Sequence, residues 1–179
     1  MPLALLAVSC RDRAPSAPVA VIDFIKEADR ADRRPPAYAV VNSVAGGDAL
    51  PAIVGPAPGR LTWTLPLPRG GRFEARVAAS GAPVAVRIGV SDARVYEQLA
   101  AASVRPGGAW TDVAADLSAY AGWKLSLFYR PERRLWRLIL SADGGPGTVA
   151  WGMPRIMASR SSALEYAARR ARLTRSEAP

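Results

Sequence analysis

The sequence contains no histidine, so it lacks the most common general base and metal ligand of proteins. A serine–histidine–aspartate catalytic arrangement is therefore excluded. Its single cysteine, Cys10, excludes an internal disulfide and a zinc site built from cysteines. Phosphate-binding loops, dinucleotide fingerprints and nucleophile elbows are also missing. No motif supports an enzyme, and we predict a non-catalytic chain that needs no cofactor.

Long apolar runs are missing too, because none reaches the roughly 18 residues that a membrane-spanning helix needs. The chain instead carries 16 prolines and 15 glycines, which punctuate its 179 residues at short intervals. Such punctuation is typical of many short strands.

The net charge is +9, and arginine supplies nearly all of the positive charge. The arginines are dispersed, and no zinc-finger spacing, helix-turn-helix pattern or RNA-recognition motif accompanies them. The sequence therefore does not favour nucleic acid as a partner. A positive surface still favours polyanions such as sulfated or acidic glycans.

Residues 1–18 form a segment of their own. The run Met1–Cys10, MPLALLAVSC, resembles the lipobox of a bacterial lipoprotein, in which the cysteine is lipidated and becomes the mature N-terminus. This resemblance implies that Cys10 anchors the chain to a membrane of the cell envelope and that residues 11–18 serve as a tether. The alternative is an ordinary N-terminus with an unmodified cysteine.

Short helices are expected on both sides of the central region. In residues 19–36, apolar Val21, Ile22 and Ile25 have helical spacing, and a pair of prolines follows, so we predict a short helix and a linker. Residues 160–179 are basic, and Ser162 and Glu165 have the S-x-x-E form of a capping box. This segment predicts a basic helix or a linker.

Residues 37–159 alternate apolar and polar side chains with the period of strands that bury one face. They predict an all-β fold, an antiparallel β-sandwich of the jelly-roll kind. Residues 94–104 fit either a helix or a strand, and we favour a strand. The loop 55–59 and the turn 143–147 are expected to separate strands. We predict strands at residues 38–44, 49–54, 60–67, 73–79, 84–90, 94–104, 110–117, 123–129, 134–141 and 148–157.

One hypothesis is that two of the acidic residues Asp92, Glu97, Asp112, Asp116 and Asp143 act as the catalytic pair of a glycosidase. Two carboxyl groups would have to converge at about 5–10 Å in a cleft. Asp112 and Asp116 lie on one predicted strand, about 13 Å apart, and are better explained as solvent-facing side chains. Asp92 follows Gly89-Val-Ser91 and fits a turn.

The aromatic residues suggest sugar binding, because aromatic rings stack on the apolar faces of pyranoses. Trp63 and Trp123 alternate with apolar residues and are expected in the core, as is Leu117. Trp110 and Tyr120 lie near strand ends and are expected to be accessible. Our candidate glycan-binding residues are Trp110, Tyr120, Tyr96 and Asp92.

Four stretches, Leu61–Trp63, Val86–Asp92, Trp110–Gly122 and Ala150–Arg155, carry a resemblance that extends over about residues 38–157. They resemble the non-catalytic jelly-roll domain that precedes the catalytic domain of some bacterial envelope sulfatases. They are also similar to carbohydrate-binding sandwiches of the galactose-binding kind. The resemblance implies an accessory module of the cell envelope that binds a polysaccharide or a sulfated glycan and is associated with a sulfatase catalytic domain.

The chain has no C/S-x-P-x-R motif, which a sulfatase active site requires, so the catalytic domain itself is not in this sequence. A purely structural spacer domain and a carboxylate-based glycoside hydrolase remain the alternative interpretations.

Overall fold

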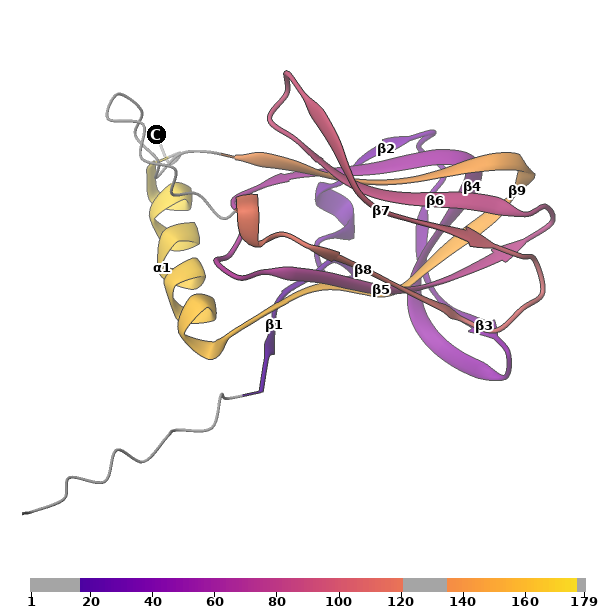
Figure 1. The fold of residues 1–179 in the computed structure, drawn as a ribbon, viewed down its shortest axis with the longest axis horizontal. Helices are drawn as coiled ribbons and strands as arrows, with labels where there is room; N and C mark the ends of the chain where they lie inside the picture. The colour runs from indigo at the N-terminus through magenta and orange to yellow at the C-terminus, as the bar shows by residue number, and fades with distance from the viewer. Residues whose placement is uncertain (1–16, 121–134, 177–179) are drawn as a thin grey trace, which may run out of the picture.

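The computed structural model describes residues 17–120 and 135–176, and their strands form the two layers of an antiparallel sandwich (Figure 1). The predicted all-β fold is confirmed. The strands are β1 Val19–Asp23, β2 Asp32–Arg34, β3 Ala39–Ala45, β4 Asp48–Leu65, β5 Arg72–Ser80, β6 Val84–Ser91, β7 Tyr96–Val104, β8 Thr111–Asp116 and β9 Trp136–Ala158. The helices are the short 3-10 helices η1 Ala28–Arg30 and η2 Ser118–Tyr120, and α1 Arg160–Ser176.

Two long strands, β4 and β9, pair with each other along most of their length and belong to both layers. The first part of β4 and the last part of β9 lie in layer A, between β3 on one side and β5 and β8 on the other. The remaining parts lie in layer B, between β2 on one side and β6 and β7 on the other. One continuous hydrogen-bonded sheet therefore folds over at a corner and becomes a sandwich.

The predicted loop 55–59 and turn 143–147 were wrong, because both stretches lie inside the long strands. They form the corner, where the register shifts between Ala57 and Gly59. A side chain at Gly55 or Gly59 would overlap Tyr38, which packs against this corner. Burial of Tyr38 raises the pKa of its phenol to about 12. Glycine and proline thus bend the strands here without ending them.

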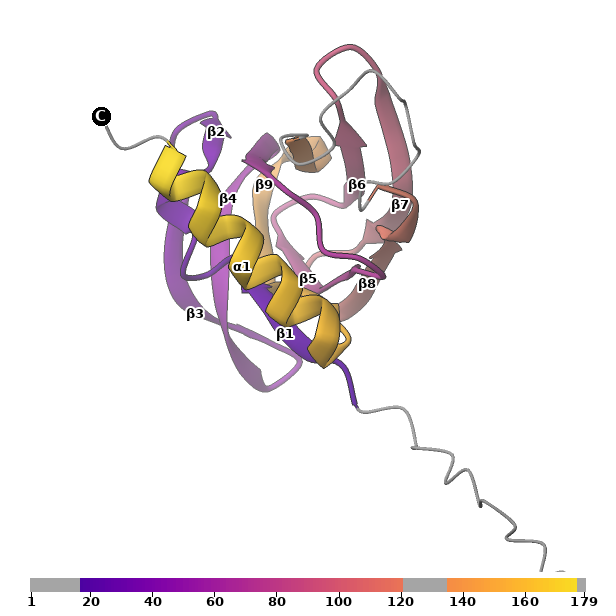
Figure 2. The same ribbon diagram turned by 90° about the vertical axis from the view of Figure 1, so that its left-hand side faces the viewer.

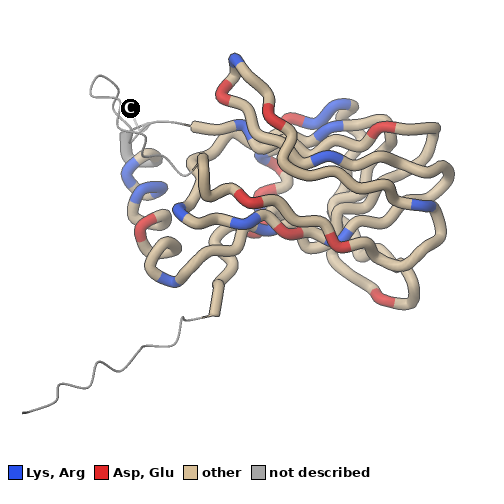
Figure 3. The backbone as a smooth tube through the Cα atoms, viewed as in Figure 1, with Lys and Arg blue, Asp and Glu red and all other residues tan. Residues whose placement is uncertain are grey.

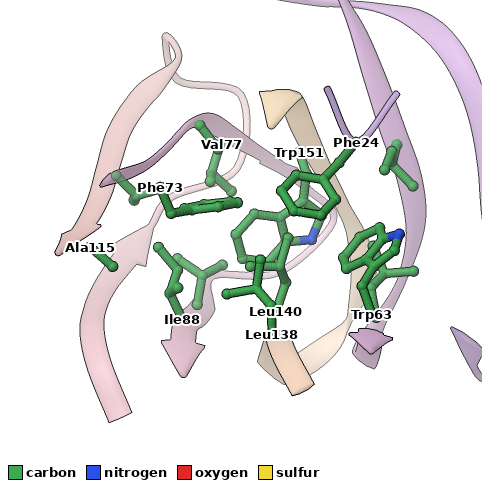
Figure 4. Close-up of a cluster of buried hydrophobic side chains, with 14 of the residues drawn as sticks. Phe24, Trp63, Phe73, Val77, Ile88, Ala115, Leu138, Leu140 and Trp151 are labelled. Atoms are coloured by element: carbon green, nitrogen blue, oxygen red, sulfur yellow. The ribbon is translucent and has the colours of Figure 1, made fainter. Parts of the chain in front are cut away.

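The core lies between the two layers and follows from the alternation in the strands (Figure 4). In layer B, Leu138 and Leu140 of β9 are fully buried, and in layer A the same is true of Trp151. Trp63 and Leu117 are 2% and 0% exposed, which confirms that both belong to the core. Trp123 and the predicted strand 123–129 lie outside the described residues, as does Cys10.

The helix predicted within residues 19–36 was wrong, because this segment forms β1, η1 and β2. β1 pairs with the end of β9, and the Phe24 amide donates to the carbonyl oxygen of Pro154 at 2.9 Å. The Trp63 indole donates to the carbonyl oxygen of Glu27 at 2.9 Å. Pairing with distant strands thus overrides the helical spacing, and the sandwich begins near residue 19 rather than at 37.

The basic segment after β9 is a helix, in agreement with one of its two predicted forms. Viewed from its end, the sandwich carries α1 diagonally across it (Figure 2). Tyr166 is 6% exposed, and the Arg170 guanidinium lies 2.7 Å from the Glu27 carboxylate. The side chain of Ser159 accepts the Ser162 amide at 3.2 Å, so Ser159, and not Ser162, caps the helix. Across the described residues, no helix combines the length and the apolarity that crossing a membrane requires.

Strand β7 confirms the strand favoured for residues 94–104, and β8 confirms most of the strand predicted at 110–117. Basic and acidic residues are scattered over the strands of both layers, as Figure 3 shows. Among the described residues, Ser91 is the one polar side chain that is buried, so the charged side chains lie at the surface.

Candidate functional site

Trp110, one of the predicted binding residues, precedes β8 and lies on the outer face of layer A. It is only 7% exposed, so the expectation that it is accessible was wrong. Its ring packs with small residues at outward positions, Ala52, Ala78 and Ala150, and its indole donates to the carbonyl oxygen of Asp48 at 2.9 Å. Small side chains on neighbouring strands leave room for the ring, a feature that no single strand reveals.

A hollow of about 280 Å³ lies beside Trp110 on the same outer face, over strands β5, β8 and β9. Gly152 joins the two features, because it lines the hollow and a Cβ there would lie 2.9 Å from the Trp110 ring. Met153 lines the hollow from a β-bulge, where its φ is 45°. The hollow is lined by Arg72, Glu74, Ala75, Arg76, Asp112, Val113, Ala114, Gly152, Met153 and Arg155.

The charged groups of the hollow are linked by ion pairs. The Arg76 guanidinium lies 3.6 Å from the Asp48 carboxylate and 3.4 Å from that of Asp112. The Glu74 carboxylate lies 3.5 Å from each of Arg72 and Arg155. A guanidinium has five N–H donors and a carboxylate about four acceptor positions, so these pairs leave hydrogen-bonding capacity for ligand hydroxyl groups.

Asp112 and Asp116 lie on β8, as predicted, and both are exposed. They face outward four residues apart on one strand, opposite Arg76 and Arg72. The Ser118 backbone amide donates to Asp116 at 2.9 Å and holds the pKa of this carboxyl below its usual range. The two acids do not form the convergent pair that glycoside hydrolysis needs.

Tyr96, the second predicted residue, lies on the opposite side of the sandwich, on the outer face of layer B. Its ring occupies the space above Gly89, where any Cβ would overlap it. Burial raises the pKa of the Tyr96 phenol, and the neighbouring Arg87 and Asp143 act on it in opposite directions. Tyr96 is 47% exposed, so a ligand can reach it.

Asp92 and Tyr120 belong to neither outer face. The Asp92 carboxylate accepts the backbone amides of Arg94 and Val95 at 3.0 Å each and shapes the β6–β7 turn, as its sequence context suggested. Tyr120 packs edge-on against Trp136 at 5.2 Å, and its burial, together with a hydrogen bond to Glu97, raises its pKa to about 12.

The structure therefore does not bring the four predicted residues together at one site. The charged residues of the hollow were not predicted from the sequence as binding residues. The alternation of Arg72, Glu74 and Arg76 with apolar residues indicates that these side chains face outward. The hollow itself also depends on the bulge in β9, a strand that is distant from them in the chain.

Comparison with known proteins addresses the fold. No protein-family model matches the sequence, and no curated protein shows significant sequence similarity. Among solved structures, the xylan-binding CBM22-1 domain of Paenibacillus barcinonensis Xyn10C is similar with a TM-score of 0.54 and 15% identity. The match covers 80% of this chain and 96% of that domain.

Two larger structures match with lower TM-scores. In Clostridium thermocellum xylanase 10B, the TM-score is 0.48 at 13% identity over 81% of this chain and 28% of the other. In Clostridium perfringens ZmpB it is 0.46 at 9% identity, over 67% of this chain and only 12% of the other. The chain spans only a small part of these two longer proteins. Its similarity to the CBM22-1 domain shows that the two share a β-sandwich fold.

Proposed function

We propose that this chain is a non-catalytic glycan-binding module and that the hollow over β5, β8 and β9 holds part of the glycan. The observation that carries the proposal is the hollow itself, a depression of about 280 Å³ lined by guanidinium and carboxylate groups. Such groups donate to and accept from sugar hydroxyls. The sandwich shares its fold with a xylan-binding domain, and this makes xylan the first ligand to test.

The proposal of a non-catalytic role is supported by the arrangement of the acids. The carboxylates at the hollow are paired with arginines, which favours binding over proton transfer.

Filling the hollow is expected to weaken glycan binding by about tenfold or more, which is the effect of losing one or two good polar contacts. Ala114 lines the hollow and lies opposite Glu74, so Ala114→Trp would occupy the space that a sugar ring needs. Affinities for soluble xylan and other neutral polysaccharides would be measured by titration calorimetry.

Ala119→Trp, at an exposed position of η2, is the matched control and is expected to leave binding unchanged. Unchanged affinity of Ala114→Trp would contradict the assignment of the hollow. Failure of the natural chain to bind any polysaccharide would favour a structural spacer domain instead.

We further propose that the module works at the cell envelope beside a sulfatase-like hydrolase. Support comes from the lipobox-like run ending at Cys10 and from the stretches that resemble sulfatase accessory domains. An adjacent or in-frame sulfatase catalytic domain in the genome would support this association, and its absence would count against it.

Cys10 is expected to incorporate a fatty-acid analogue when the full chain is produced in a bacterial host. Globomycin should block maturation of the precursor, and Cys10→Ala should remove the label and release the protein from the membrane fraction. A natural chain that stays soluble and unlabelled would refute lipid anchoring.

A further inference from the structure

We propose that the outer face of layer B binds an anionic polysaccharide, one bearing sulfate or carboxylate groups, through a row of arginines. This inference rests on the proposed glycan-binding function and names a second surface and its ligand class. The surface lies on the opposite side of the sandwich from the hollow.

The row is built by strand register. Arg34 of β2 lies opposite Arg60 of β4, Arg60 lies opposite Ser141 of β9, and Ser141 lies opposite Arg87 of β6. These residues face outward because their neighbours Leu61 and Leu140 are fully buried in the core. Three arginines from three strands therefore stand in one line across the sheet.

The spacing suits an extended ligand. Neighbouring strands lie about 4.8 Å apart, so the backbones of Arg60 and Arg87 are separated by about 10 Å. Arg137 faces outward on β9, four residues from Ser141 and thus about 13 Å further along the strand. Arg137 and Tyr96 both lie opposite Ser91 of β6, so the exposed tyrosine continues the same surface.

The charge balance of this face leaves two guanidinium groups available. Arg34 lies 3.3 Å from Asp32, and Arg87 forms an ion pair with Asp143. Arg60 and Arg137 are exposed and have no ion pair or side-chain hydrogen bond with any other residue in the described ranges. In the hollow, by contrast, every arginine is ion-paired.

The chemistry favours an anionic sugar polymer. A guanidinium matches the oxygens of sulfate and carboxylate in a two-point hydrogen bond. Thr62, Thr64 and Ser141 place hydroxyl groups among the arginines, where sugar hydroxyls can exchange hydrogen bonds with them. Single-stranded nucleic acids are bound by platforms of several aromatic rings, whereas this face has one exposed aromatic side chain, Tyr96, in the described part of the chain.

Dextran sulfate and unmodified dextran form a matched pair of probes, because they differ only in the sulfate groups. The full chain is expected to bind dextran sulfate, with an affinity that falls steeply as salt rises. The double variant Arg60→Gln/Arg137→Gln should bind about tenfold or more weakly and with a shallower salt dependence. Thermal unfolding would verify that the variant is folded.

The control is Arg94→Gln/Arg105→Gln, which removes the same charge from exposed positions before and after β7. It is expected to retain affinity within about threefold, the size of a long-range charge effect. If both double variants lost affinity equally, the net charge of the chain would explain the binding, and the proposal would be overturned. Absence of dextran sulfate binding would overturn it as well, and so would tighter binding of duplex DNA through the same two arginines.

Ala114→Trp separates this inference from the proposed function. It should weaken neutral glycan binding at the hollow and leave dextran sulfate binding unchanged. If neutral binding is confirmed while the Arg60/Arg137 variant keeps full affinity for dextran sulfate, only the arginine row is refuted. If the arginine variant loses dextran sulfate while Ala114→Trp has no effect on neutral glycans, only the hollow is refuted.

Discussion

Replacing Phe24 with alanine is expected to lower the free energy of unfolding by about 3–5 kcal/mol, the range for deleting a buried phenylalanine. The side chain is 0% exposed, and its ring centroid lies 4.7 Å from that of Trp63 and 6.0 Å from that of Phe73. Removing the ring would leave a cavity between the two layers, because strands β4 and β5 on either side are fixed by their pairing with β9. Urea unfolding followed by tryptophan fluorescence measures the change.

Lys26→Ala is the control two residues further on. Its side chain is 81% exposed and forms only a surface ion pair with Asp23, so the expected change is within about 0.5 kcal/mol. A loss below about 1 kcal/mol for Phe24→Ala would mean that residues 19–34 unfold separately from the sandwich. The expected result also implies that a chain beginning at residue 37 would lose β1 and Phe24 and would not form a stable sandwich.

Replacing Trp110 with alanine is expected to cost about 3–5 kcal/mol, because the ring is 7% exposed and packs on an alanine-lined surface of layer A. Part of the cost comes from the carbonyl oxygen of Asp48, which loses its hydrogen bond from the indole. Trp110→Phe keeps most of the ring contact and loses this hydrogen bond, so a smaller cost is expected. Urea unfolding distinguishes the two variants.

Val44→Ala provides the comparison, because Val44 is 67% exposed on β3 and its truncation should change stability by less than about 0.5 kcal/mol. A stable Trp110→Ala variant that has lost glycan binding would show instead that Trp110 contacts the ligand directly. The expected loss of stability assigns Trp110 a supporting role beside the hollow.

The sequence predicted the strands of the sandwich well where alternation is local. Leu61, Trp63 and Leu65 alternate with polar residues, and this pattern needs no knowledge of the neighbouring strands. The prediction from the sequence failed at residues 55–59 and 143–147, because glycine and proline occur both in loops and in bent strands and give the same local pattern in each. The partner strand decides between them, since continued hydrogen bonding across the corner keeps the bent segments in the sheet.

The sequence also failed for residues 19–36, where Val21, Ile22 and Ile25 fit a helix. Pairing with β9 places Ile22 and Phe24 in the core instead, and a contact between segments that far apart has no local signal. The position of Trp110 near a strand end was predicted correctly, but its burial depends on Ala52, Ala78 and Ala150 from three other strands.

Composition and two-residue alternation are local properties, so the β-sandwich fold, the lack of histidine and the lack of a recognised catalytic motif all follow from the amino-acid sequence. Which residues of different strands lie side by side on one face depends on how the strands pair in the folded chain. Register aligns Arg34, Arg60 and Arg87 across layer B and places the bulge at Met153 beside Arg76. Both surfaces arise from pairing between strands that are distant in the chain, and such pairing is fixed by the packing of the whole core.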